Sequence, residues 1–158
     1  MAKMDIQPFE EYMAIMENLS KKDKREVIDS ALYEGAKIVA DEIKDEMQKL
    51  STYDNMHEGL TEDEKKDIID GFGIAPIRHS NDISDVKIGF DGYGRKKTKR
   101  WPKGVPIPVT VRSLVSGTSF RKKNDFIRRA VRRKKKKSIE KMNEVINEKI
   151  MKEMKENG

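Results

Sequence analysis

A continuous apolar stripe over residues 28–50 constrains the fold of this chain more than any other feature. Its members recur at steps of three and four, which places them on one face of an α-helix. They are Ile28, Leu32, Gly35, Ala36, Val39, Ile43, Met47 and Leu50. Ser20 is in position to cap this helix, and acidic residues and lysines occupy its other faces. We therefore predict a helix over residues 20–50, which at 1.5 Å per residue is ~45 Å long.

A second long helix is predicted over residues 124–155, with Asn124 as its cap. It has one apolar patch near its start and another further along. The patches consist of Phe126, Ile127, Ala130 and Val131, and of Ile139, Met142, Val145, Ile146, Ile150 and Met154. The run RRKKKK at 132–137 between them has no apolar member. This part of the helix is expected to stand in solvent or against an acidic partner.

Shorter elements are predicted elsewhere along the chain. Pro8 suits the first turn of a short helix at 8–19, within an N-terminal helical extension over 1–20. Thr61 and Glu64 form a capping box that starts a helix ending near Gly71. Alternating and β-branched segments on either side of the polar stretch HSNDIS predict a β-hairpin over 72–90.

The segment after the hairpin contains a loop and one ambiguous element. Residues 91–105 include GYGRKKTKRWPKG, with glycines, a proline and no periodicity, which predicts a flexible basic loop. Residues 107–116 allow two interpretations. The run Val109–Val111 favours a strand, whereas Val111, Leu114 and Val115 are spaced for a short helix ending at Gly117.

The composition restricts how large the core is. Charged residues make up 39% of the 158 residues and apolar residues 35%, against about 25% charged in an average domain. We predict a single domain over 1–158 of the α+β class. A small antiparallel β-sheet packs against the long helix of the N-terminal half, and a long C-terminal helix follows. Its small core favours an extended monomer, or burial against copies of itself.

Charge of opposite sign is carried by separate segments. Residues 1–86 hold 11 basic and 21 acidic side chains, a net charge of −10. Residues 87–137 hold 19 basic and 2 acidic side chains, a net charge of +17. Such a chain can bind a polyanion through its basic part, or stack head to tail with itself as ring-forming subunits do.

The sequence offers little for catalysis. There is no cysteine, and His57 and His79 lie far apart, which disfavours a metal site. The common phosphate-binding and nucleophile-elbow motifs are missing. We therefore expect no enzyme activity, no cofactor and no metal. No apolar run is long enough to cross a membrane, and the N-terminus does not resemble a secretion signal, so a soluble intracellular protein is expected.

The basic loop leaves two functions open. Tyr93 and Trp101 beside five cations could stack on bases while lysines meet phosphates. Runs of charge are more often solvated surface, and no helix-turn-helix, zinc-finger or RNA-recognition signature is present. A nucleic-acid-binding protein that uses Arg95–Trp101 and Arg128–Lys137 therefore stays an alternative to an interaction protein.

Several segments together resemble the head–tail joining proteins of long-tailed bacteriophages and prophages, which are small neck or tail-completion proteins. They are HEGLTEDEKKDIIDGFGIAPIR, DVKIGFDGYG and RSLVSGTSFRKKNDFIRRAV, and the similarity covers most of residues 22–155. The positions that match the family pattern are Gly73, Ala75, Pro76, Gly89, Tyr93, Ser116, Gly117, Thr118, Phe120, Phe126, Ile127, Arg128 and Ala130. The chain departs from the pattern at Asp125, where such proteins often have proline.

The resemblance implies a structural virion protein that forms a ring, hexameric in the virion, at the head–tail junction. Its expected partners are copies of itself, a neck or head-completion protein and a tail-tube or tail-terminator protein. Genome DNA would pass nearby without specific binding, and whether the free protein is a monomer is left open. The protein would be made in the bacterial host cytoplasm. The resemblance also favours a helix over a strand at 107–116.

The mechanism that we expect is docking of complementary charged faces. The acidic helix at 21–50 of one subunit would approach the basic 121–137 segment of its neighbour, and the basic loop would order on an acidic partner ring. The candidate contacts are Arg95, Lys96, Lys97, Lys99, Arg100, Trp101, Arg121, Lys122, Lys123, Arg132, Arg133, Lys134, Lys135, Lys136 and Lys137.

Overall fold

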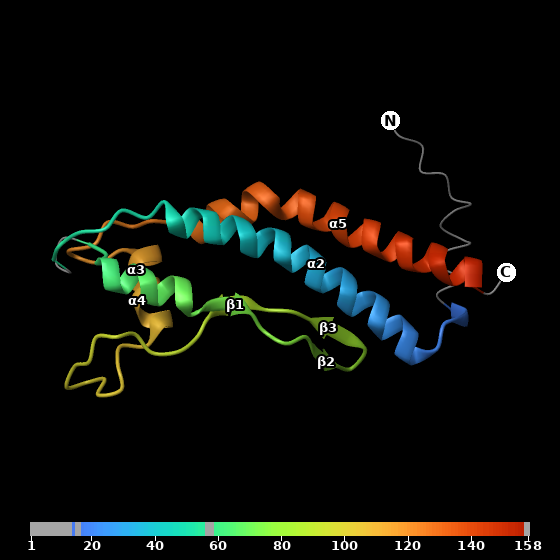
Figure 1. Ribbon diagram of the computed structural model, residues 1–158, viewed down its shortest axis with the longest axis horizontal. Coiled ribbons are helices and arrows are strands. Elements are labelled where there is room, and N and C mark those ends of the chain that lie inside the picture. The colour runs from blue at the N-terminus through green and yellow to red at the C-terminus, as the bar shows by residue number, and fades with distance from the viewer. Residues whose placement is uncertain (1–13, 15–16, 56–58, 157–158) are drawn as a thin grey trace.

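The computed structural model describes residues 14, 17–55 and 59–156 and has an α+β fold, as predicted. Two long helices run side by side along the whole molecule, and a narrow hairpin with two short helices lies against one of them (Figure 1). The elements in chain order are α2 (Lys21–Gln48), α3 (Glu62–Asp70), β1 (Phe72–Ile74), β2 (Arg78–Ser80), β3 (Ile83–Asp85), β4 (Ile88–Phe90), α4 (Ile107–Ser116) and α5 (Phe126–Glu156).

Helix α2 confirms the prediction from the apolar stripe. Ser20 caps it, because its side chain accepts a hydrogen bond from the Asp23 backbone N–H. The buried face differs from the prediction at the N-terminal end, where Ile28 is 37% exposed and Val27 is buried instead. Ile28 instead lines an open groove between α2 and the turn of the hairpin. The predicted helix at 8–19 lies outside the described residues, except that Ala14, Glu17 and Asn18 are helical.

Helix α5 follows α2 for almost its whole length (Figure 1). The prediction that Asn124 caps it was wrong. The helix begins at Phe126, and its first main-chain hydrogen bond runs from the Arg129 N–H to the Asp125 carbonyl. The Asn124 side chain instead accepts a hydrogen bond from the Arg129 guanidinium.

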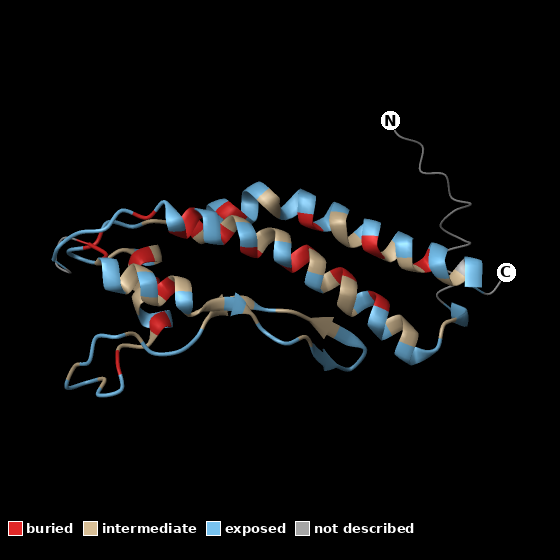
Figure 2. Ribbon diagram, viewed as in Figure 1, coloured by how far each residue is buried: buried red, intermediate tan, exposed pale blue. Residues whose placement is uncertain are grey.

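Small side chains let α2 and α5 approach closely along the half of the pair that is far from α3 and α4. Buried residues line the facing sides of the two helices (Figure 2). Those of α2 in this stretch are Val27, Ala31, Gly35, Ala36 and Ala40. The buried Ser138 hydroxyl of α5 donates a hydrogen bond of 2.8 Å to the Gly35 carbonyl. A Cβ at Gly35 would fall 2.3 Å from the terminal carbon of Met142 and 2.6 Å from its Cγ, so any larger residue there would force the Met142 side chain to move.

Most of the large, fully buried apolar side chains gather at the opposite end of the molecule, and Ile150 near the end of α5 is the exception among the described residues. There the end of α2, helices α3 and α4, and the start of α5 enclose one cluster. Phe126, Met47, Leu60 and Ile68 are its fully buried large members. The paired strands β1 and β4 close this cluster through Phe72 and Phe90, whose ring centroids are 5.1 Å apart.

The hairpin over residues 72–90 is confirmed, although it forms two short paired segments rather than one sheet. Antiparallel β1 and β4 pair Gly73 with Gly89. Antiparallel β2 and β3 are joined by Asn81 and Asp82, both with positive φ, as a tight primed turn requires. The chain has residues 75–77 between β1 and β2, but only residues 86–87 between β3 and β4. The extra residue forms a bulge that contains Pro76 and offsets the register.

Tertiary packing decides the ambiguous segment at 107–116, which is the helix α4. Its first turn contains Pro108, and its spacing buries Ile107, Val111 and Leu114 in the apolar cluster. A strand could not place three residues at this spacing on one side.

The capping box of α3 is also confirmed, with Glu64 accepting a hydrogen bond from the Thr61 N–H.

Candidate interaction surfaces

The basic loop at 91–105 is closed by its own backbone. The Gly94 N–H donates to the Val105 carbonyl, and the Val105 N–H donates to the Lys96 carbonyl, both at 2.8 Å. At its base Tyr93 forms an isolated bridge with Pro106. Gly104 is buried with a φ of 117°, a backbone region that disfavours other residues. The predicted flexibility of this loop stays a prediction.

Arg95 fastens the basic loop to α3 rather than presenting a charge to a partner. Its guanidinium forms ion pairs with Asp67 and, at 3.2 Å, with Asp70. Its backbone N–H also donates to the Asp67 carboxylate at 2.9 Å. This candidate contact therefore has a role within the chain.

The tip of the basic loop presents the remaining cations. Arg100 lies 4.8 Å from the centre of the Trp101 ring, a cation–π arrangement. Lys97 and Lys99 are exposed, as is Lys96, which also has a contact within the chain. The partly buried indole is thus already covered on one side by Arg100.

Arg121 is a core residue rather than a surface contact. Only 5% of it is exposed, and its guanidinium donates to both oxygens of Glu64 at 2.7 and 2.8 Å and to Ser113 at 2.9 Å. The preceding turn positions it, because the Thr118 hydroxyl accepts from the Arg121 N–H at 3.0 Å. Gly117 has a φ of 77° where α4 ends and this turn begins.

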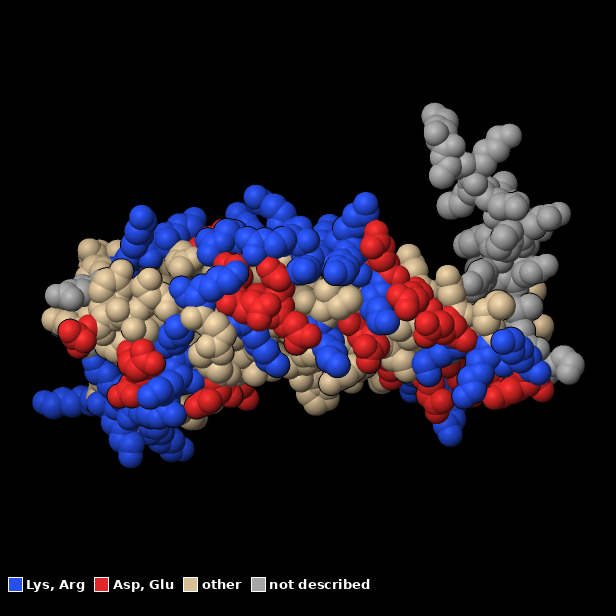
Figure 3. Space-filling view, turned by 45° about the horizontal axis from the view of Figure 1, so that its top comes forward, with Lys and Arg blue, Asp and Glu red and all other residues tan. Residues whose placement is uncertain are grey.

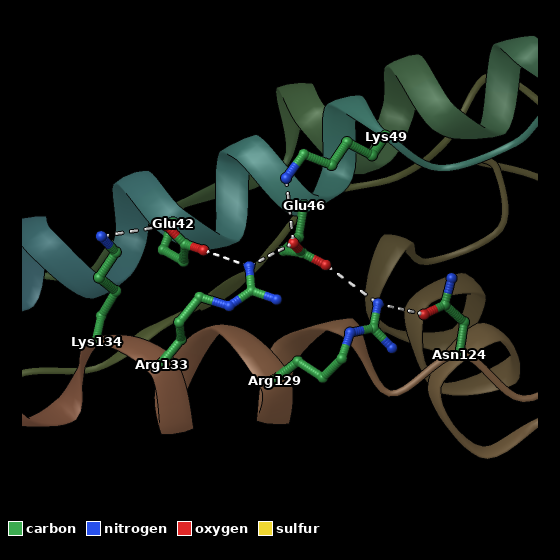
Figure 4. A network of polar contacts seen from close by, with 7 residues as sticks. All are labelled: Glu42, Glu46, Lys49, Asn124, Arg129, Arg133 and Lys134. Carbon is green, nitrogen blue, oxygen red and sulfur yellow. Dashed lines mark hydrogen bonds and ion pairs between the residues drawn. The ribbon is translucent and has the colours of Figure 1, made fainter.

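The acidic and basic segments meet within one chain, in a network between α2 and α5 (Figure 4). Arg133 bridges Glu42 at 2.7 Å and Glu46 at 3.0 Å. Arg129 reaches Glu46 at 3.1 Å, and Lys134 reaches Glu42 at 3.7 Å. The side chains of Glu42 and Glu46 are 11% and 7% exposed, so the two carboxylates are largely removed from water.

Hydrogen bonding keeps both carboxylates charged. The guanidinium of Arg133 lowers the pKa of Glu42, and that of Arg129, together with Arg133, lowers the pKa of Glu46. The two glutamates in turn raise the pKa of Arg133. Three of the predicted partner contacts at 121–137, namely Arg121, Arg133 and Lys134, are therefore paired inside the chain. This finding leaves a smaller surface for a neighbouring subunit than the sequence suggested.

Four exposed cations on the solvent side of α5 form what we call the basic ridge, Arg128, Arg132, Lys135 and Lys136. Arg128 lies 3.8 Å from the Asp125 carboxylate, one turn before it. Lys and Arg side chains gather along the first half of this helix, with acidic side chains beside them (Figure 3). Val131 and Ile139, four residues before and after Lys135, are 39% and 48% exposed. Apolar side chains are therefore exposed next to the charges of the basic ridge. Lys137 is exposed too, on another side of the helix.

A contact series that the sequence did not reveal joins the hairpin to α2. His79 Nε2 lies 3.2 Å from the Asp29 carboxylate, and His79 Nδ1 lies 2.9 Å from the Ser84 hydroxyl. His79 and Ser84 face each other across the paired strands. Serine, histidine and aspartate also form hydrolytic triads, which additionally need N–H donors around a substrate oxyanion. In this structure His79 contacts Asp29 of α2 and Ser84 of β3, so the three residues connect strands β2 and β3 to helix α2.

The residues of the family-like pattern have mainly structural positions. Phe126 and Ala130 are fully buried where α5 begins. Tyr93 and Phe120 are 60% and 43% exposed, so both are candidates for contact with a partner. A Cβ at Gly73 or Gly89 would meet nothing within 4 Å, so no other residue covers β1 and β4 on this face at these two positions.

Within the described residues, no group of three or more acidic or histidine side chains is arranged to hold a metal ion. No helix of that part of the chain is long and apolar enough to span a bilayer. No protein-family model matches the sequence, and neither a curated protein nor a solved structure matches it. The resemblance to head–tail joining proteins therefore stays a prediction from the sequence motifs.

Proposed function

We propose that this chain is a non-catalytic structural subunit that joins the head and the tail of a long-tailed bacteriophage. It would act in a ring, docking by its exposed faces onto copies of itself and onto neck and tail proteins. The order of the sequence motifs supports the family, and the elongated, highly charged molecule fits a subunit whose burial is completed by partners.

The observation that carries the docking role is the mixed chemistry of the basic ridge. Val131 and Ile139 are exposed beside Arg132 and Lys135 on the solvent side of α5. Protein interfaces combine apolar contacts with charged rims, whereas a phosphate backbone offers no apolar surface to cover aliphatic side chains. A protein face with acidic groups around an apolar centre is the partner that fits this ridge.

A genetic experiment tests the proposal directly. Deleting the coding sequence from the phage or prophage genome that carries it should leave filled heads and separate tails, seen by negative-stain electron microscopy. Supplying the intact protein in trans should restore joined particles. Joined particles without the protein would contradict the proposal.

Charge reversal on the basic ridge tests the docking surface. The variant Arg132→Glu/Lys135→Glu should fail to restore joined particles, since the ridge would repel its acidic partner. The matched control uses two lysines at the start of α2, Lys22, which is exposed, and Lys24, which is partly exposed. Their double reversal to glutamate should restore joining.

Nucleic-acid binding is the second candidate, favoured by the contact of Arg100 with Trp101 beside further exposed lysines. The docking role predicts weak, sequence-indifferent DNA binding that falls steeply with salt. A gel shift should show no sequence-selective complex at physiological salt. Sub-micromolar selective binding under these conditions would favour the alternative.

A further inference from the structure

A cationic pocket lies where α2 ends and α5 begins, apart from the basic ridge. It has a volume of about 380 Å³ and is open to solvent. Lys49, Asn124 and Arg129 come together at this end of the two helices (Figure 4). Five of its lining residues are cations, Lys49, Arg121, Lys122, Lys123 and Arg129, and no acidic residue of the described chain lines it.

Nearby carboxylates of the described chain neutralise only part of the positive charge of the pocket. Glu46 pairs with Lys49 and Arg129, and Glu64 pairs with Arg121. Five cations against these two carboxylates leave three positive charges in excess. Lys122 and Lys123 are exposed and make no ion pair within the described part of the chain. The pocket therefore attracts an anion from outside.

The inner side of the pocket combines a paired, buried cation with apolar side chains. Arg121 is held by Glu64 and Ser113, while its Nε–H has no hydrogen-bond partner and is buried. Leu50, Leu60 and Leu114 form an apolar floor. The amino end of the long helix α5 adds positive partial charge beside it.

We infer that this pocket, the lysine pocket, binds an acidic side chain and its apolar neighbour from an adjoining protein subunit. A compact recess with an aliphatic floor and a cationic rim matches a short peptide segment. A nucleic-acid backbone instead presents phosphates at regular intervals and suits an extended row of cations rather than a compact recess. The choice of a protein ligand rests on the proposed docking function.

Binding of a labelled model peptide tests this inference on the free, full-length protein. The probe is a fluorescein-labelled hexapeptide of alternating glutamate and leucine, measured by fluorescence anisotropy. Lys122→Glu/Lys123→Glu should weaken binding about tenfold, since two exposed attractions of up to about 1 kcal/mol each are lost. The control Lys135→Glu/Lys136→Glu makes the same change on exposed lysines of the basic ridge and should leave binding within about twofold.

Two further measurements keep the result specific. The peptide with glutamine in place of glutamate should not bind, and amide NMR shifts of the unmutated protein on titration should concentrate at residues 121–124 and 49–53. Equal weakening by both double variants, shifts spread along α5, or displacement of the peptide by a short DNA duplex at equal concentration would overturn the inference.

The outcomes separate this inference from the proposed function. If the peptide does not bind but the genetic experiment shows unjoined heads and tails, the lysine pocket is wrong and the joining role stands. If the peptide binds and heads and tails join without the protein, the pocket stands and the joining role is wrong.

Discussion

The two ends of the molecule are held together by different kinds of contact. At the globular end, where α3, α4 and the start of α5 surround the end of α2, large apolar side chains such as Phe126 and Met47 are fully buried. In the arm, formed by residues 21–40 of α2 and 138–156 of α5, the buried residues of α2 are mostly small, and α5 contributes the Ser138 hydroxyl together with Val145 and Ile150. The charge network of Glu42 and Glu46 lies between the two.

From this difference we expect the arm to open more readily than the globular end. Burial of large side chains contributes most of the stability of a small domain, whereas small residues bury little area each. The arm buries fewer large side chains, and it depends in addition on a close fit at Gly35, which one added side chain can disrupt. The following predictions test this separation, beginning with the largest effect.

Phe126→Ala should destabilise the whole protein by about 3–5 kcal/mol, because it leaves a cavity at a fully buried position. Urea unfolding followed by circular dichroism measures the change. Val131→Ala, at an exposed position of the same helix, should change stability by less than about 0.5 kcal/mol. A small effect of Phe126→Ala would show that the globular end does not dominate stability.

Arg121→Met should cost about 3 kcal/mol, since it leaves the carboxylate of Glu64 without its cation in a largely buried site. Adding Glu64→Gln should recover part of the loss, because glutamine can keep the hydrogen bond to the Thr61 N–H. Thermal unfolding of both variants measures this. If the double variant is no more stable than the single one, the buried charge is not the cause.

Gly35→Leu should separate the arm helices and cost about 1–3 kcal/mol, since the added side chain overlaps Met142 and Ser138. Hydrogen exchange should quicken in the arm while amides near Phe126 keep their protection. Lys37→Leu, at an exposed position two residues further along α2, is the control and should leave exchange unchanged. Equal loss of protection at both ends would contradict independent opening.

Acid should weaken the charge network between the two ends. The folded-state pKa values of Glu42 and Glu46 are lowered, so their stabilising contribution is complete above the ordinary carboxyl value of 4.5 and is lost as pH falls through the folded-state values. Stability should therefore fall below pH 4.5. Glu46→Gln should flatten this fall, measured as midpoints of urea unfolding across pH. An unchanged slope would show that Glu46 does not link protonation to folding.

Sequence patterns predicted the parts of the fold that depend on local chemistry. The apolar stripe that follows Ser20 predicted α2, and the capping box of Thr61 and Glu64 predicted α3. The alternating and β-branched segments on either side of HSNDIS predicted the hairpin. These signals are local because caps, turns and amphipathic periods involve residues a few positions apart. The same reasoning failed at Asn124, where a tertiary contact with Arg129 replaced the local cap.

The candidate surfaces were predicted less well. Charge runs identified the basic loop and the 121–137 segment, but not which cations are used inside the chain. Arg95, Arg121 and Arg133 each pair with carboxylates of α2 or α3 that are distant in sequence. The link between Asp29 and His79 had no sequence signal, because it joins a helix to a hairpin 50 residues further along.

The amino-acid sequence by itself determined two long helices, a hairpin and the separation of acidic from basic segments. Tertiary structure alone decided that residues 107–116 are helical, that the two charged segments meet within one chain, and that Lys122 and Lys123 stand beside a pocket. The physical reason is that helix periods and caps act over a few residues. Ion pairing and burial depend instead on which distant segments the packing of the core brings together.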